Sequence, residues 1–184
     1  VDEAFFSEEV PIRLRSKVTG EVWLLFVGSG WDRKNVIACI EAMSQLPLHF
    51  SLWIIGYDKN ESKYRAYCKK IGLESRVIFL GKQKVSKRTY AQFDGLILPS
   101  IYDPFPNVAC EALVSGLPIF VSMATGASDY KGFAGVNVCD SESSLGKSLA
   151  ELDYGLEKPD IEFFKGEFAM RNATEFVSAF LGYD

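Results

Sequence analysis

The sequence has a single histidine, no Cys-x-x-Cys pair and no long hydrophobic run. His49 has no acidic or cysteine neighbour in the sequence, so we interpret it as structural rather than as a catalytic base or metal ligand. The longest apolar runs, such as Val22 to Val27, are strand-sized, whereas a membrane-spanning helix needs about 20 apolar residues. These absences argue against a metal-centred enzyme and against an integral membrane protein.

Basic residues are slightly outnumbered. The 184 residues include 20 Lys and Arg against 24 Asp and Glu, a formal net charge of −4, which argues against a broad nucleic-acid-binding surface. The length fits one domain that needs no disulfides to bury its core. No signal peptide is visible and the chain begins with Val1 instead of Met, so we expect an excised fragment or a processed product.

The cysteines have mostly apolar or helical neighbours. Thiols buried in the core of a cytoplasmic protein are therefore favoured over a metal site or disulfides. The four residues are Cys39, Cys68, Cys110 and Cys139.

Short apolar runs alternate with helical patterns along the whole chain. Continuous apolar runs of this length suit strands covered on both faces. The alternation predicts a doubly wound, open parallel α/β sheet of about six strands, Rossmann-like in class. The expected strands are Val22–Val27, Phe50–Ile55, Val77–Leu80, Leu96–Leu98, Pro118–Ser122 and Gly135–Cys139. The expected helices begin at an N-cap on Asp32, at Glu61, near Ser86, near Pro106 and at Ser141, and a helical tail follows over Phe163–Leu181.

Four turns follow the carboxyl ends of the predicted strands, at residues 28–34, 56–58, 81–83 and 100–107. Ligands of open parallel sheets bind outside the carboxyl ends of the strands. We therefore expect the ligand site on this single rim.

The stretch from Asp103 to Glu111 is the most informative, because it separates two carboxylates by eight residues. Pro106 is predicted at or near the first position of a helix, where a missing N–H costs nothing. The unpaired amides and positive dipole end of such a helix bind anions. The roughly 12 Å that eight helical residues span suits a sugar, a diphosphate and a ribose in a row. The spacing alone is equally typical of a surface turn with solvated carboxylates.

The turn from Gly28 to Lys34 lacks the third glycine of the dinucleotide fingerprint and the Gly-Lys-Ser/Thr of a P-loop. Gly28 and Gly30 leave room for backbone, and Arg33 and Lys34 then stand at a helix start, where cations oppose the helix dipole. This arrangement favours an anion bound against the two cations over two solvated surface charges.

These motifs, in this order, resemble the C-terminal, donor-binding half of family 4 retaining glycosyltransferases, which have the two-domain GT-B fold. Within that family the chain resembles the lipopolysaccharide-core glucosyltransferases. The similarity runs from about Val1 to Tyr154, and residues 1–20 resemble the linker that follows the acceptor domain. The segments that carry it are 27–34, 54–58, 77–81, 98–100 and 103–118.

The resemblance implies a nucleotide-diphosphate sugar as donor, with a UDP-sugar favoured over a GDP-sugar, and transfer without metal or cofactor. It implies that Lys34, with Arg33 beside it, binds the diphosphate. Asp103 stands where the family usually has glutamate and would hold a hydroxyl of the transferred sugar. Glu111 would accept both ribose hydroxyls, which suits a carboxylate with two oxygens.

The resemblance also implies donor contacts from the backbone. Amides at Phe105, Asn107 and Val108 would face sugar and phosphate, while Pro106 replaces a frequent glycine and has no N–H to donate. The backbone around Gly81 and Lys82 would meet the base edge.

At three positions on the rim the resemblance does not give a clear role toward the donor. Ser29 replaces an arginine that many members carry after Gly28, so the diphosphate contact rests on the Arg33–Lys34 pair. Trp31 and Tyr57 could stack on a base or sugar, but packing against another domain is favoured.

The resemblance places the acceptor-side residues on an N-terminal domain that this chain lacks, so we expect the chain alone to bind donor and transfer little. The acceptor would be a glycan or glycolipid of lipopolysaccharide, capsule or related assembly, reached in the cytoplasm or at the inner face of the membrane with only peripheral membrane contact. Residues 155–184 would pack toward that domain, and an apolar docking face is favoured over a membrane stripe for the tail aromatics Phe163, Phe164, Phe168, Phe176 and Phe180.

Two other classes stay open. A GT-B-fold sugar-nucleotide epimerase would need its own catalytic carboxylates and histidine, and His49 is poorly placed for that. A flavodoxin-like signalling domain would need an acidic cluster after the first strand, where this chain has Arg33 and Lys34.

Overall fold

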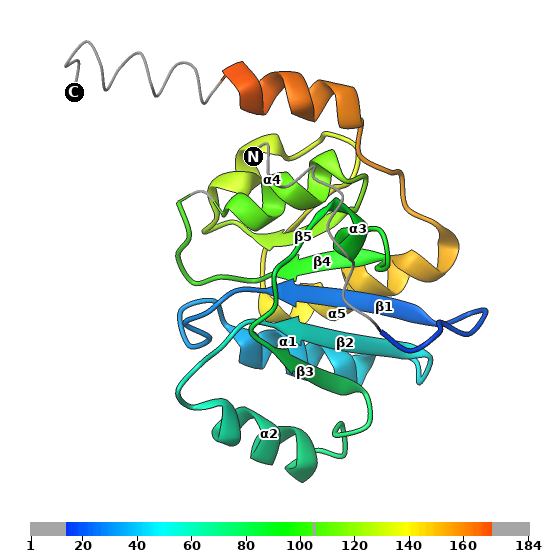
Figure 1. Ribbon diagram of the computed structural model, residues 1–184, viewed down its shortest axis with the longest axis vertical. Helices are drawn as coiled ribbons and strands as arrows, with labels where there is room; N and C mark the ends of the chain where they lie inside the picture. The colour runs from blue at the N-terminus through cyan, green and yellow to red at the C-terminus, as the bar shows by residue number, and fades with distance from the viewer. Residues whose placement is uncertain (1–13, 105, 171–184) are drawn as a thin grey trace, which may run out of the picture.

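The six strands among the residues that the structure describes lie parallel in one sheet, in the order β3-β2-β1-β4-β5-β6. Figure 1 labels the first five. The structure, a computed structural model, describes residues 14–104 and 106–170. The strands are β1 (Val22–Val27), β2 (Phe50–Ile55), β3 (Val77–Gly81), β4 (Gly95–Leu98), β5 (Ile119–Ser122) and β6 (Val136–Cys139). Each lies within one residue of its predicted bounds, so the expected doubly wound α/β fold is confirmed.

The order of connection reverses between β1 and β4. From β1 the chain adds β2 and β3 on one side, then returns to place β4, β5 and β6 on the other. A crevice forms where two neighbouring strands send their following loops in opposite directions, and ligands of such sheets bind there. The loops that follow β1 and β4 therefore define the first place to look for a site.

Helices cover both faces of the sheet. Right-handed crossovers put α1 (Val36–Gln45) and α2 (Glu61–Lys70) on one face and α4 (Asn107–Val114) on the other, because the two halves of the sheet grow in opposite directions. α5 (Glu142–Ala150) packs beside α1, and the short α3 (Lys87–Tyr90) packs beside α4. Two 3-10 turns, η2 (Gly126–Tyr130) and η3 (Glu151–Tyr154), complete the connections, and the sequence did not predict η2.

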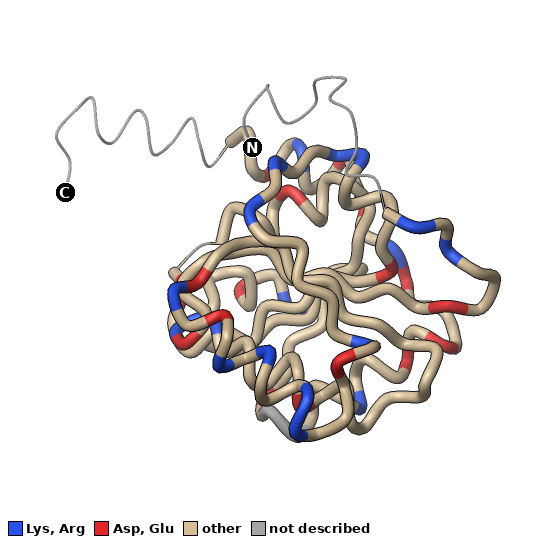
Figure 2. Tube along the Cα trace, turned by 60° about the horizontal axis from the view of Figure 1, so that its bottom comes forward, with Lys and Arg blue, Asp and Glu red and all other residues tan. Residues whose placement is uncertain are grey.

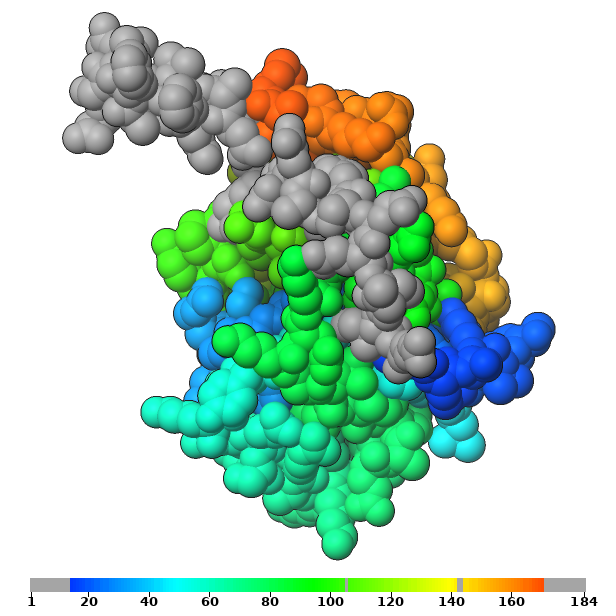
Figure 3. Space-filling view, in the orientation of Figure 1, coloured from blue at the N-terminus to red at the C-terminus, as the bar shows by residue number. Residues whose placement is uncertain are grey.

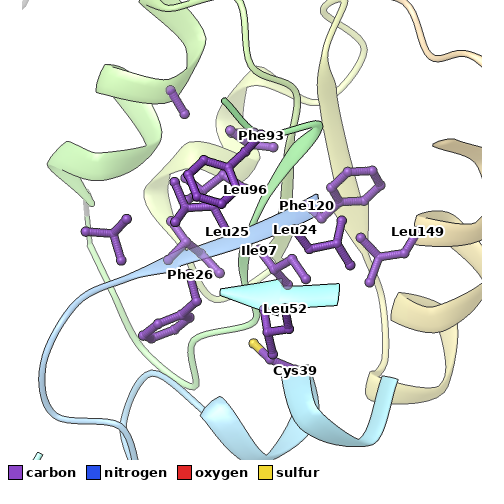
Figure 4. Packing of buried hydrophobic residues seen from close by; sticks show 14 of the residues in the cluster. Leu24, Leu25, Phe26, Cys39, Leu52, Phe93, Leu96, Ile97, Phe120 and Leu149 are labelled. Carbon is purple, nitrogen blue, oxygen red and sulfur yellow. The ribbon is translucent and has the colours of Figure 1, made fainter. Parts of the chain in front are cut away.

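The core lies on both sides of the central strands. Every residue of β1 and β2 is buried, as continuous apolar runs require. Figure 4 shows Leu24, Leu52 and Phe120 on the side from which Cys39 of α1 and Leu149 of α5 approach. All four cysteines are buried and unbridged, as expected.

The start of α1 differs from the prediction. Asp32 does not cap the helix; residues 31–35 form a turn, and α1 begins at Val36 after Asn35, which has a left-handed backbone (φ 53°). Asp32 instead accepts a hydrogen bond from the Tyr64 hydroxyl at 2.6 Å. Lys34 therefore lies in the turn before the helix, with its side chain against Gly28.

The tail also differs from the prediction. Residues 161–170 are helical and lie at the end of the molecule far from α2 (Figures 1 and 3). Ile161 approaches Gly116, two residues after the end of α4. Phe164 and Phe168 are buried against Tyr130 of η2, so they belong to this domain's own core and are not an exposed docking face. Phe176, Phe180 and residues 1–13 of the expected linker fall outside the described residues.

Candidate functional site

Three charged side chains meet where β1 and β4 end. The Lys34 ammonium lies 2.8 Å from a carboxylate oxygen of Asp103, and the Arg33 guanidinium lies 3.9 Å from the same oxygen. The Lys34 and Asp103 side chains are only 12% and 10% exposed. Residues 69 positions apart thus form a nearly dry ion pair at the topological switch point of the sheet.

Backbone hydrogen bonds hold the loops that carry these charges. The Ile101 amide donates to the Arg33 carbonyl at 2.9 Å, and the Arg33 guanidinium donates to the Tyr102 carbonyl at 2.7 Å. The backbone amide of Asp103 donates to the Ala124 carbonyl, and the backbone carbonyl of Asp103 accepts from the Gly126 amide. Asp103 therefore sits between the loops after β1 and β5, held by main chain before any ligand arrives.

Two glycines let the loops approach each other. At Gly28 (φ +150°) a Cβ atom would lie 2.8 Å from the Lys34 Cδ, so the lysine side chain crosses directly over this residue. At Gly56 (φ +138°) a Cβ atom would lie 1.9 Å from the Gly28 carbonyl oxygen. Gly30 also has a positive φ, but nothing surrounds its Cβ position, so it serves only the turn.

Trp31 anchors the loop after β1 from beneath. Its amide donates to Asp58 and its indole N–H donates to the Gly28 carbonyl, each at 2.9 Å. The ring is 1% exposed and packs on Tyr64 and Phe79. Both readings of Trp31 from the sequence, ligand stacking and packing on another domain, are therefore wrong, because the indole is an internal support.

Other rim residues remain at the surface. Tyr57 is 59% exposed beside this loop, and Ser29 and Lys82 are also exposed. The Gly56 amide donates to the Gly81 carbonyl at 2.9 Å, which ties the turns after β2 and β3 together. The same rim as the ion pair therefore carries the predicted donor contacts Ser29, Gly30, Tyr57, Gly81 and Lys82.

The amino end of α4 points at the same region. Pro106 is its N-cap, one position earlier than the first helical residue, and no described side chain caps the helix. Since the Ala109 amide already bonds the Pro106 carbonyl, Asn107 and Val108 supply the amides at the tip. Phe105 lies outside the described residues. Such a tip, a few residues after Asp103, can bind an anion through amides and dipole.

Glu111 lies one helical turn further along α4, partly buried. The Tyr90 hydroxyl donates a 2.7 Å hydrogen bond to its Oε2. Burial, and then the nearby Glu111 charge, raise the pKa of Tyr90, so this hydroxyl stays a donor. The two carboxylates therefore have different partners: Asp103 faces the cations, and Glu111 lies beside α3.

Sequence reasoning missed Tyr90. No sequence signal pointed to this residue, because its hydrogen bond to Glu111 depends on α3 packing against α4. The turn at residues 56–58 was expected on this rim, and its Asp58 accepts the hydrogen bond from the Trp31 amide.

Charged residues of both signs are interspersed over the described chain (Figure 2). Among the described residues, no group of three His, Cys, Asp or Glu could hold a metal ion. None of the helices in those residues has the length and apolar content that a membrane crossing requires.

A basic pair and a helix tip at the topological switch point give this α/β domain a rim that is suited to an anion. Comparison with known proteins makes the class specific. Residues 21–152 match the family described as glycosyl transferases group 1, and the chain belongs to this family.

Individual proteins similar to this chain are also glycosyltransferases. The chain is 30% identical over 133 residues to the lipopolysaccharide glucosyltransferase WaaG of Escherichia coli, a match that takes in 70% of this chain and 35% of WaaG. The crystal structure of WaaG superposes with a TM-score of 0.66 at 28% identity, over 75% of this chain and 39% of that one. An Anabaena protein, HepE, solved with UDP-glucose, has the same fold (TM-score 0.59, 18% identity, 84% of this chain and 49% of that one). The resemblance stated from the motifs is confirmed, and the chain spans between about a quarter and a half of the curated relatives it matches.

Proposed function

We propose that this chain is the donor-binding part of a retaining glycosyltransferase and that its rim holds a nucleotide-diphosphate sugar. The observation that carries the proposal is the nearly dry Lys34–Asp103 pair, set at the switch point beside the open tip of α4. Family membership over residues 21–152 supports the same reading.

The diphosphate would lie between Lys34, Arg33 and the amides of Asn107 and Val108. These groups are cations and oriented N–H donors in a partly dry site, where they stabilise the charge that develops on a leaving diphosphate. Asp103 holds the Lys34 ammonium at 2.8 Å before the donor binds. It would then accept a hydroxyl of the transferred sugar.

The nucleoside would lie along the rim toward β3. Glu111 would accept the ribose hydroxyls, and the exposed Tyr57 and the backbone at Gly81 and Lys82 would border the base. A UDP-sugar is favoured over a GDP-sugar, and the complex of HepE with UDP-glucose supports that choice. We expect transfer to need no metal and no cofactor.

The acceptor would be a glycan or glycolipid of bacterial lipopolysaccharide, capsule or similar assembly, bound by an N-terminal domain. The similarity to WaaG, a lipopolysaccharide glucosyltransferase, supports this class of acceptor. The work would take place in the cytoplasm, with at most peripheral contact at the inner face of the membrane.

Calorimetry with UDP, GDP and uridine tests the donor site. Lys34→Ala should weaken UDP binding by roughly tenfold or more and leave uridine nearly unchanged, because the lost charge faces phosphate. Added salt should weaken the wild type more than the variant. Lys17→Ala, which breaks an ion pair on the opposite rim, is the matched control and should change neither. Equal losses for UDP and uridine, or no binding of either diphosphate by the wild type, would overturn the proposal.

A transfer assay tests the division of labour. The 184-residue chain should hydrolyse a bound UDP-sugar slowly if at all and transfer no sugar, because closing two domains supplies the orientation for transfer. Fusion to an acceptor domain from the same family should restore transfer. Rapid transfer by this chain alone, with contaminating enzyme excluded, would contradict it.

A further inference from the structure

Tyr90 makes an unusual contact for a fully buried tyrosine. Its side chain has no exposed surface, yet its hydroxyl reaches a carboxylate, donating to Glu111 Oε2 at 2.7 Å. A hydrogen bond to a charged acceptor is stronger than one between neutral groups and fixes the direction of the carboxylate.

The helix that carries Tyr90 is built to hold it still. α3 has only four residues, too few to be stable alone. A reciprocal capping box between Ser86 and Thr89, both buried, fixes its first turn. The Tyr90 amide donates to the Ser86 carbonyl within that turn, so the cap also positions Tyr90.

Only one oxygen of Glu111 is used by this bond. A carboxylate has about four acceptor sites on its two oxygens, so a second donor pair can still be accepted. The Ser115 hydroxyl bonds the Glu111 carbonyl, which belongs to the main chain and leaves the carboxylate as it is.

We infer that Tyr90 is a positioning residue for ribose recognition, holding one carboxylate oxygen of Glu111 so that the other receives the ribose hydroxyls. The inference rests on the proposed function, since it takes Glu111 as the ribose acceptor. It goes further by assigning a role to a residue that touches no ligand, and by predicting that its effect depends on the hydroxyls of the sugar.

Calorimetry with UDP and with 2′,3′-dideoxy-UDP tests this. Tyr90→Phe keeps the buried ring and removes only the hydroxyl; it should weaken UDP binding by about tenfold and leave dideoxy-UDP unchanged. In a Glu111→Ala background the same change should have no further effect, because the group that it positions is gone.

Tyr67→Phe is the matched control. It removes a hydroxyl that donates to Glu41 at 2.7 Å, a tyrosine–carboxylate bond between α2 and α1, and should alter binding of neither nucleotide. Thr89→Ala is a second variant for the case that Tyr90→Phe fails to fold, because it removes the side-chain half of the capping box that holds Tyr90 and leaves Glu111 in place. It should show the same selective loss of UDP affinity to a smaller degree.

The outcomes separate the inference from the proposed function. If the wild type binds UDP but Tyr90→Phe leaves affinity unchanged, or weakens UDP and dideoxy-UDP equally, Tyr90 merely ties α3 to α4 and the inference is overturned alone. If the wild type binds neither UDP nor GDP, the proposed function fails and the inference fails with it. A selective loss with UDP supports both.

Discussion

The two rims of the sheet treat their charges differently. On the amino rim, Arg15 pairs with Glu21 just before β1, and their side chains are 50% and 23% exposed. On the carboxyl rim, Lys34 and Asp103 pair with side chains near 10% exposed, between loops of two different strands. The first pair stays in water; the second is almost removed from it.

This difference separates an ion pair that stays in solvent from one that folding has largely desolvated. An exposed ion pair adds little stability, because water and salt screen it. A nearly buried pair costs desolvation, and losing one partner leaves the other stranded. The Lys34–Asp103 pair on the carboxyl rim therefore carries a desolvation cost that packing alone does not explain. A role in binding an anion, as proposed above, would explain it.

The glycines of the two rims should differ most. Gly56→Ala should lower the free energy of unfolding by about 3 kcal/mol or more, because its Cβ would lie 1.9 Å from the Gly28 carbonyl and a loop must move. Gly20→Ala, at a positive φ on the amino rim with nothing near its Cβ position, should cost about 1 kcal/mol. Urea unfolding of both variants measures the difference, and equal losses would mean that the loops after β1 and β2 are not tightly packed.

Breaking the ion pairs should cause the next largest difference in stability between the two rims. Asp103→Ala should destabilise the chain by about 3 kcal/mol, since it leaves the Lys34 ammonium nearly buried without its closest partner. Lys17→Met, which breaks the pair with Asp94 on the amino rim, should cost below about 1 kcal/mol. Adding Lys34→Met to Asp103→Ala should recover part of the loss. A denaturation series in which the two rims respond alike would refute this contrast.

Gly28 and Gly30 sharpen the comparison within one loop. Gly28→Ala should displace the Lys34 side chain that crosses it and weaken UDP binding by about tenfold. Gly30→Ala should cost only about 1 kcal/mol of stability, with UDP affinity kept, because its Cβ position is open. Calorimetry on the two folded variants distinguishes them; a loss of affinity in both would implicate the turn as a whole and not Lys34.

The smallest effect should be the pH response of the amino rim. Hydrogen bonds from Arg15 and from the Val18 amide hold the pKa of Glu21 at about 2, below its ordinary value of 4.5. The unfolded chain therefore binds a proton first as pH falls, so the pair contributes fully above about pH 5 and progressively less toward pH 2. Glu21→Gln should be slightly less stable than the wild type at pH 7, with a gap that narrows by pH 3. A gap that is constant or widens over that range would contradict the assignment.

Much of the fold could be read from local pattern. Each strand is a short apolar run, and burial on both faces requires such a run regardless of its neighbours. The helix near Pro106 was also expected from a local feature, the proline at its start, and α4 begins at Asn107. The start of α1 could not be read, because Asn35 adopts a left-handed turn and Asp32 is taken by Tyr64 from another helix.

The candidate site divides in the same way. Lys34, Arg33, Asp103 and Glu111 were named from their positions at strand ends and at a helix start, and their roles toward a donor stay predictions. Trp31 was misread because an indole in a glycine-rich loop looks exposed until Tyr64 and Phe79 close over it. Phe164 and Phe168 were misread similarly, since η2, which receives them, leaves no periodic signal.

The sequence by itself determined the strands, most of the helices, the rim on which a ligand would bind and the family. Those depend on which residues are apolar, which are glycine or proline, and in what order they come. Only the tertiary structure decided the partners: Lys34 with Asp103 across the switch point, and Tyr90 with Glu111 between α3 and α4. The pattern of apolar residues along a chain is a local property, so the sequence shows it directly. The partner of a charged side chain depends on which strands and helices become neighbours in the fold.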